Sequence, residues 1–243
     1  MRILIFTLFM TGVIAFGSNN IEVNKDDFEL EYLIRRPKDT VKKAPVLLLL
    51  HGYGSNENDL FSLSPQIPEN WLVVSVRAPI KVNSNQYKWY DVKLVDEKIT
   101  INTHDEEKSR KSLLRFIEEI VSKYNGKKDR VVTAGFSQGA NIALSLTLTA
   151  PEKVFAAACF SGRFMPEIEP HIANSNLLIK KEIFIGHGTE DKMLPLKYAT
   201  NNQAILQSYG IQVTLFTDKI AHAISQKEAK AFTVWLNRLK ENK

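Results

Sequence analysis

The sequence predicts an α/β fold in which a mostly parallel central sheet is flanked by helices on both faces. Short, continuous apolar runs recur along the chain, and such runs are typical of strands that are covered on both faces, as in a parallel sheet. Amphipathic segments with helical spacing lie between some of these runs, so strands and helices alternate as in βαβ units. The 243 residues, 44% of them hydrophobic, are enough for one large domain of this kind.

The first predicted strand differs from the others. Phe28, Leu30 and Tyr32 alternate with glutamates, which predicts an antiparallel or edge strand buried on one face only. The continuous apolar runs that follow predict six buried strands at residues 46–50, 71–76, 130–134, 154–160, 182–185 and 213–216. Apolar residues at helical spacing predict one helix over residues 105–124 and another over 226–239, the second preceded by a capping box of Ser225 and Glu228.

The N-terminus has the pattern of a secretory signal peptide. A positive start at Arg2 precedes an apolar stretch over residues 3–16, and Ala15 and Gly17 are small residues at the positions that a signal peptidase reads. The stretch is shorter than the roughly 20 residues that span a bilayer. We therefore expect residues 1–17 to be removed and the protein to be exported, periplasmic or secreted, without stable membrane insertion. A retained N-terminal anchor is the alternative. Residues 18–243 contain no repeat and no linker, which predicts a single domain.

Composition excludes several classes of protein. The single cysteine, Cys159, cannot form an internal disulfide, and no Cys/His cluster suggests a metal site. Lys and Arg number 32 against 27 acids, a net charge of +5, but these charges are scattered and no basic run is interleaved with aromatics. We expect no nucleic-acid partner and no metal.

The segment Gly135-Phe-Ser137-Gln-Gly139 carries the strongest chemical signal. It lies directly after the strand predicted at 130–134 and before the apolar segment 140–148, where a tight strand-to-helix turn would lift a serine hydroxyl to the edge of the sheet. Small flanking residues suit such a turn because its backbone is strained and another segment passes close by. Ser137 is therefore the candidate nucleophile, and a glycine-rich turn without chemistry is the alternative.

A serine nucleophile needs a histidine to take its proton and an acid to orient that histidine. On a fold of this type the chain order is serine, acid, histidine, which places the histidine late. His51 and His104 precede Ser137, while His171 and His187 leave almost no room for an acid on a later strand. His222, in a loop after the strand predicted at 213–216, is the candidate base.

The acid is expected between Ser137 and His222. Asp191 follows the strand predicted at 182–185 and is the favoured candidate, with Glu190 and Asp218 as competitors. An oxyanion also needs free backbone N–H groups. The loop after the strand predicted at 46–50 and the residue after the nucleophile supply them, which predicts that the amides of Tyr53 and Gln138 form the oxyanion hole. His51 is then expected to be a structural hydrogen-bonding residue of that loop.

Six segments together resemble the phospholipase/carboxylesterase family of α/β hydrolases, which includes the acyl-protein thioesterases. They are HGYGSNENDL at 51–60, RAP at 77–79, WYD at 89–91, GFSQGAN at 135–141, HGTEDKMLP at 187–195 and AHAISQKE at 221–228. The resemblance runs over roughly residues 28–240. It implies an α/β-hydrolase fold with the same three catalytic residues and the same oxyanion amides, and it places Trp89 on a loop beside the substrate cleft. Core packing is the alternative for Trp89.

The function expected from these observations is that of an exported serine esterase that forms an acyl-enzyme and needs no cofactor. The segment 162–181 is too short for a large helical cap, so we expect an open cleft and a small-molecule or polysaccharide-linked ester as substrate. Feruloyl or acetyl esterase, thioesterase and lysophospholipase activities remain open, as does the oligomeric state. Two competing hypotheses are a serine peptidase of the same fold and a catalytically silent binding protein built on it.

Overall fold

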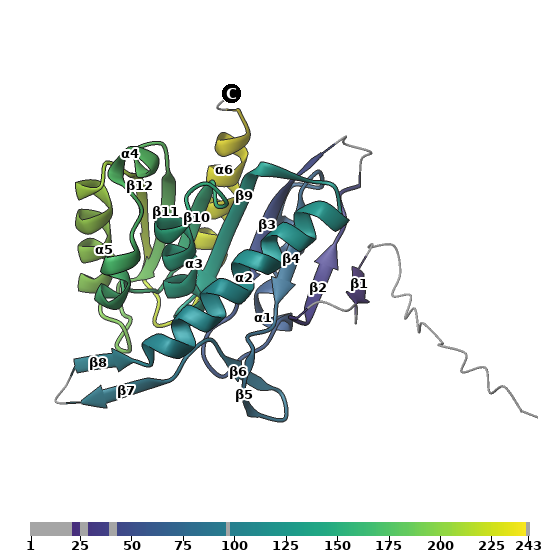
Figure 1. The fold of residues 1–243 in the computed structure, drawn as a ribbon. Coiled ribbons are helices and arrows are strands. Elements are labelled where there is room, and N and C mark those ends of the chain that lie inside the picture. The colour runs from purple at the N-terminus through teal and green to yellow at the C-terminus, as the bar shows by residue number, and fades with distance from the viewer. Residues whose placement is uncertain (1–20, 25–28, 39–42, 96–97, 242–243) are drawn as a thin grey trace, which may run out of the picture.

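The computed structural model describes residues 21–24, 29–38, 43–95 and 98–241. The main sheet consists of β1 (Ile21–Asn24), β2 (Tyr32–Arg35), β3 (Ala44–Leu50), β4 (Leu72–Val76), β9 (Gly126–Phe136), β10 (Ala156–Phe160), β11 (Glu182–Gly188) and β12 (Gln212–Asp218). The strand order is β1-β2-β4-β3-β9-β10-β11-β12 (Figure 1). All pairings from β4 to β12 are parallel, and the pairings of β2 with β1 and β4 are antiparallel. The predicted α/β architecture is therefore confirmed, and the signal-peptide prediction for residues 1–17 lies outside the described residues.

The six continuous apolar runs all form parallel strands, whereas the alternating segment is displaced. The strand was expected over residues 28–32, but β2 begins at Tyr32, and Phe28 lies outside the described residues. Glu29 accepts a hydrogen bond from the Ser112 hydroxyl at 2.8 Å, while the Glu31 carbonyl accepts from the Arg77 amide, just after β4, at 2.8 Å. The expected antiparallel pairing is confirmed, and the alternation holds over residues 29–32, where Leu30 and Tyr32 are buried and Glu29 and Glu31 are exposed. Within β2 itself, however, Tyr32, Leu33 and Ile34 are all buried, so the strand is covered on both faces and not on one only.

Helices cover both faces of the sheet. One face packs against α2 (Thr103–Lys123), α3 (Gln138–Thr149), α4 (Ser175–Leu178) and α5 (Lys197–Ser208), and the other packs against α1 (Asn58–Phe61) and α6 (Gln226–Glu241). The helices predicted over residues 105–124 and 226–239 are confirmed as α2 and α6. The predicted capping box is also present, because the Glu228 amide donates to the Ser225 hydroxyl at 3.0 Å and the Ser225 amide donates to the Glu228 carboxylate at 3.3 Å.

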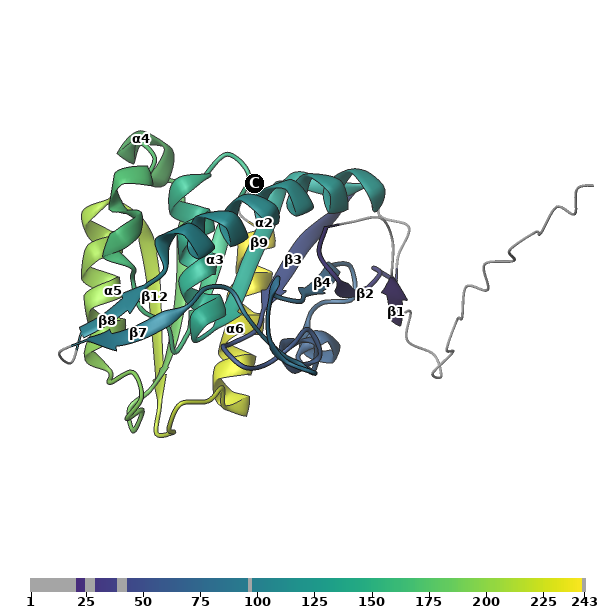
Figure 2. The ribbon, with the colours of Figure 1, turned by 60° about the horizontal axis from the view of Figure 1, so that its bottom comes forward.

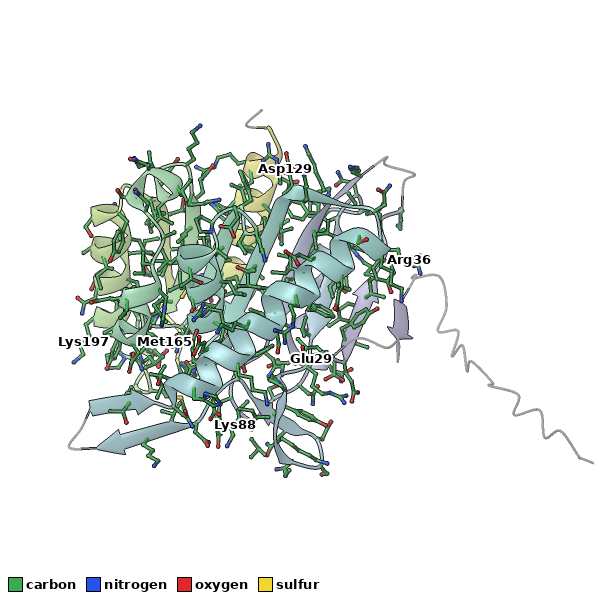
Figure 3. All side chains as sticks on the ribbon, in the orientation of Figure 1. Glu29, Arg36, Lys88, Asp129, Met165 and Lys197 are labelled. Carbon is green, nitrogen blue, oxygen red and sulfur yellow. The ribbon has the colours of Figure 1, made fainter. Side chains whose placement is uncertain are left out.

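The parallel strands end together at the lower edge of the sheet in Figure 1. Figure 3 places Asp129, near the start of β9, at the top, and Met165, shortly after β10, toward the bottom. Two hairpins that the sequence analysis did not predict lie at this lower edge: β5 (Ile80–Asn83) with β6 (Gln86–Lys88), and β7 (Val92–Val95) with β8 (Lys98–Ile101). In Figure 1 the β7–β8 hairpin lies below α5, and in Figure 2 it lies in front of that helix.

The segment 162–181 forms no large cap. It contains a short 3₁₀ helix, η2 (Pro166–His171), and α4, and their residues Ile168 and Leu178 are buried in the core. A second 3₁₀ helix, η1 (Ser64–Gln66), follows α1. Because Ile168 and Leu178 are buried in the core, the segment packs onto the domain and does not form a separate helical cap.

Candidate active site

Ser137 lies on a strained turn between β9 and α3. Its φ angle is +52°, a left-handed conformation that side-chain-bearing residues rarely adopt. Two glycines make the turn possible: a Cβ at Gly135 would lie 2.2 Å from the backbone of Gly139, and a Cβ at Gly139 would lie 2.0 Å from the carbonyl oxygen of Leu50. The Ser137 amide donates to the Phe160 carbonyl at 2.8 Å, which ties the turn to β10. The predicted strand-to-helix turn with obligatory small neighbours is confirmed.

Three residues from three different loops converge at this turn. Nε2 of His222 lies 3.0 Å from the Ser137 hydroxyl oxygen, and Nδ1 of His222 lies 2.7 Å from the Asp191 carboxylate. Because a carboxylate can only accept, Nδ1 carries the proton, and Nε2 is left to accept from the serine hydroxyl. The side chain of Asp191 is fully enclosed, whereas His222 and Ser137 are partly exposed. The geometry is that of a serine whose proton can pass to an oriented imidazole.

The Asp191 carboxylate is held from both sides. One oxygen, Oδ1, accepts from the backbone amides of Met193 and Leu194, both at 2.9 Å, and the other faces His222. His187, which the sequence analysis did not place in the site, donates from Nε2 to the Leu194 carbonyl at 2.7 Å and lies 3.6 Å from Asp191 Oδ2. These contacts fix the carboxylate in one orientation, which is what a residue that orients an imidazole requires.

The competing acids are turned elsewhere. Glu190 is exposed and lies 3.7 Å from the ammonium of Lys219. The Asp218 carboxylate accepts from the Lys219 amide at 2.9 Å and lies 3.7 Å from the Lys227 ammonium. The pKa of Asp218 is lowered, mainly by a hydrogen bond from the Ser225 side chain. The backbone around Asp218 nevertheless supports the site, because its carbonyl accepts from the Thr189 amide at 2.8 Å and so joins the acid turn to the loop of His222.

The loop after β3 lies against the nucleophile turn. His51 is fully buried, and its Nε2 accepts from the Ala78 amide at 3.0 Å while its Nδ1 donates to the Gly52 carbonyl at 2.7 Å. Burial lowers the pKa of His51, so the neutral ring that this pattern requires is favoured. The prediction of a structural role for His51 is confirmed. Among the described residues, neither the Tyr53 amide nor the Gln138 amide has a hydrogen-bond partner, so both are free to donate to an oxyanion.

The structure corrects the expectation that Trp89 lines the cleft. Its side chain is fully buried, and its indole Nε1 donates to the His51 carbonyl at 2.9 Å. The Gln138 side chain completes this arrangement by accepting from the Trp89 amide and donating to the Tyr90 carbonyl, both at 2.8 Å. Trp89 therefore lies in the core and stabilises the loop after β3 through its hydrogen bond to the His51 carbonyl. Sequence reasoning missed the Gln138 side chain because only tertiary contact brings residues 49 positions apart together.

The described residues contain no group of three or more His, Cys, Asp or Glu side chains that could hold a metal ion. No helix in the described ranges is both long and apolar enough to cross a membrane.

Comparison with known proteins decides the family. The model of the phospholipase/carboxylesterase family matches residues 33–239, nearly the whole described chain. The chain belongs to the phospholipase/carboxylesterase family. The match spans every strand from β3 to β12 and all three residues that converge at Ser137, so the resemblance seen in six short segments is confirmed.

Relatives within this family act on esters and thioesters. The chain is 26% identical over 219 residues to acyl-protein thioesterase 1 of Candida albicans, a match that covers 80% of this chain and 92% of that protein. It is 30% identical over 197 residues to the esterase YpfH of Escherichia coli, with 75% and 77% covered. The crystal structure of a Bacillus cereus carboxylesterase superimposes with a TM-score of 0.75 at 27% identity, covering 86% of this chain and 94% of that one. Membership of this group supports an ester-hydrolysing enzyme.

Proposed function

We propose that the protein is an exported serine esterase in which Ser137, His222 and Asp191 are the catalytic residues and no cofactor takes part. The observation that carries this proposal is the continuous hydrogen-bonded line from the Ser137 hydroxyl through His222 to Asp191, at 3.0 and 2.7 Å. Its placement at the end of the parallel strands, on a strained turn, is where a serine hydrolase of this fold presents its nucleophile.

In the acylation step, the Ser137 oxygen forms a bond to the ester carbonyl carbon while its proton passes to Nε2 of His222. The carbonyl oxygen becomes an oxyanion that the Tyr53 and Gln138 amides stabilise by donating to it. The carbon–oxygen bond to the alcohol then breaks, and Nε2 returns the proton to the leaving alcohol. Asp191 keeps Nδ1 protonated throughout and stabilises the transient imidazolium.

In the deacylation step, water attacks the acyl-enzyme and gives a proton to Nε2 of His222. Collapse of the second tetrahedral intermediate breaks the bond between the acyl carbon and the Ser137 oxygen, which takes the proton back. The products are a carboxylic acid and an alcohol, and the enzyme is restored. A thioester would follow the same steps with a thiol as leaving group, and the thioesterase names of several relatives favour testing this second candidate activity.

Export through an N-terminal signal peptide over residues 1–17 is the second part of the proposal. It rests on the charge and apolar pattern of that segment. Fractionation of cells that produce the full chain, followed by N-terminal sequencing, should find a mature protein that begins at Ser18 outside the cytoplasm. An uncleaved chain in the cytoplasmic fraction would contradict export.

Hydrolysis of 4-nitrophenyl esters from acetate to dodecanoate, with a feruloyl ester and an acyl thioester added, tests the activity. The variant Ser137→Ala should abolish hydrolysis of every substrate, whereas Ser208→Ala, at the exposed end of α5, should match the wild type. A fluorophosphonate probe should label the wild type and the Ser208 variant but not the Ser137 variant. Equal hydrolysis by wild type and Ser137→Ala, or an unlabelled wild type, would overturn the proposal.

A further inference from the structure

Arg163 lies directly beside the nucleophile turn. It follows β10, the strand between β9, which leads to Ser137, and β11, which leads to Asp191. The backbone amide of Arg163 donates to the side-chain oxygen of Asn141 at 2.7 Å. The backbone amide of Asn141 in turn donates to the Ser137 carbonyl at 3.2 Å. The backbone of Arg163 is therefore two hydrogen bonds away from that of Ser137, at the same edge of the sheet.

Two buried asparagines hold the segment that carries Arg163. Asn141 on α3 binds the Arg163 amide, while Asn202 on α5 accepts from the Phe164 amide at 2.6 Å and donates to the Gly162 carbonyl at 3.1 Å. Both asparagines are at most 6% exposed. The position of Arg163 is thus fixed from two helices, in the way that binding residues are fixed when their geometry matters.

The guanidinium of Arg163 lacks a partner for its charge. The residue is 6% exposed, and Nη1 makes a single hydrogen bond, to the Phe164 carbonyl at 3.1 Å. Nη2 is enclosed and has no acceptor, and no ion pair joins Arg163 to any described carboxylate. Glu167, four residues later, does not fill this role, because its own buried Oε2 is also without a donor.

Other cations with little exposure in the described ranges have an ion pair or several carbonyl acceptors, although Nε of Arg35 is itself without a partner. Arg110 pairs with Glu106 at 3.2 Å, and the Lys181 ammonium donates to the carbonyls of Pro151 and Val154. The half-buried Arg35 donates to four backbone carbonyls. Removing a guanidinium from water without such partners is costly. Arg163 is the exception among these, and it is the one next to the nucleophile.

We propose that Arg163 binds a carboxylate carried by the substrate, so that the enzyme prefers esters with a second, anionic group. This inference rests on the proposed esterase function and narrows its substrate class. A planar guanidinium binds a carboxylate through two parallel, charge-assisted hydrogen bonds. Binding requires the Arg163 side chain to turn toward Ser137 and to exchange its one hydrogen bond with the Phe164 carbonyl for two with the anion.

Two matched substrate pairs test this inference. In the first pair, the mono-4-nitrophenyl ester of succinic acid, which carries the anion on its acyl side, is compared with 4-nitrophenyl butyrate. In the second pair, 3-carboxyphenyl butyrate, which carries the anion on its alcohol side, is compared with phenyl butyrate. In at least one pair, the wild type should have the higher kcat/KM for the anionic member. Arg163→Met should lower that anionic-to-neutral ratio by about 10- to 100-fold, the effect of losing a charged hydrogen-bond pair, mainly through KM. Arg163→Lys should keep part of the preference.

Arg115→Met is the charge-matched control, because Arg115 is an exposed residue of α2 that pairs with Glu29. It should leave both ratios at the wild-type value. If Arg163 serves only as an ionic partner of Glu167, Arg163→Met and Glu167→Gln will lower kcat/KM equally for the anionic and the neutral ester. The anionic-to-neutral ratios will then be unchanged, which will overturn the inference. Ser137-dependent hydrolysis of the neutral esters with no anionic preference would refute the role of Arg163 while leaving the esterase proposal intact.

Discussion

Replacing Glu228 by glutamine should stabilise the protein at alkaline pH and not at pH 4.5. Glu228 is 1% exposed, and one of its carboxylate oxygens, Oε1, has no hydrogen-bond partner. A Cβ at Gly186 would lie 2.0 Å from that oxygen, which shows how closely it is packed against β11. Burial, with a smaller contribution from the charge of Asp218, raises the pKa of Glu228 from 4.5 to about 7.

The size of the effect can be worked out from that shift. In the unfolded chain the carboxyl ionises near pH 4.5, but in the folded protein it holds its proton up to about pH 7. The folded state thus binds more protons than the unfolded state across this window, so the free energy of unfolding falls as pH rises from 4.5 to 7 and then levels off. At about 1.4 kcal/mol for each pH unit, the loss amounts to about 3 kcal/mol.

Glutamine resembles the protonated acid and can still accept from the Ser225 amide, so it keeps the capping box but cannot ionise. The free energy of unfolding is measured by urea unfolding, followed by tryptophan fluorescence, at pH 4.5, 6 and 8.5. The difference in this free energy between Glu228→Gln and the wild type should increase by about 3 kcal/mol in favour of the variant between pH 4.5 and pH 8.5. Glu169→Gln, a change at an exposed residue of η2, is the control and should show no such trend. A Glu228→Gln effect that is constant across this range would refute the reasoning.

Four further predictions test the site and the core. His222→Gln and Asp191→Asn should each lower kcat by about 10⁴-fold, because both disrupt proton transfer from Ser137. The control variants His104→Gln and Asp218→Asn should retain most activity. Comparable losses in all four variants would contradict the assignment. Gly139→Ala should prevent folding, since its Cβ would lie 2.0 Å from the Leu50 carbonyl, and a wild-type circular-dichroism melting curve would disprove this. Gln138→Ala should lower the free energy of unfolding, measured with urea, by about 2 kcal/mol, because it leaves the Trp89 amide and the Tyr90 carbonyl without a partner. An unchanged free energy of unfolding would contradict a stabilising role for these two hydrogen bonds. Cys159, whose pKa burial raises to about 12, should resist iodoacetamide until the protein is unfolded, and rapid labelling of the native protein would show that it is not enclosed.

Local patterns were informative wherever one stretch of chain carries its own constraint. The apolar runs indicated the six parallel strands because a strand covered on both faces needs apolar residues at every position. The nucleophile turn could be recognised because its strain and close packing require glycine at 135 and 139 within five residues of sequence. The capping box at Ser225 and Glu228 was readable for the same reason, since its two hydrogen bonds join residues three positions apart.

The same local reasoning failed where burial depends on distant partners. The alternation over residues 28–32 correctly indicated that Leu30 and Tyr32 are buried and that Glu29 and Glu31 are exposed, but it did not show that β2 begins only at Tyr32 and is covered on both faces between β1 and β4. The resemblance placed Trp89 beside the cleft, yet hydrogen bonds to His51 and Gln138 hold it in the core. The two hairpins between β4 and α2 were not predicted.

The order of residues along the chain was enough to define the fold class, the position of the turn at Ser137 and a short list of partners, because it limits which histidine and acid can follow the nucleophile. The sequence favoured Asp191 among the acids, and the structure shows it bonded to His222 while Glu190 and Asp218 are turned elsewhere. The absence of a charged partner for Arg163 beside Ser137 emerged from the folded arrangement alone. The hydrogen bonds that establish the site join residues 31 and 85 positions apart, from His222 to Asp191 and to Ser137. Such contacts depend on how the strands order and pack, which no local pattern of residues encodes.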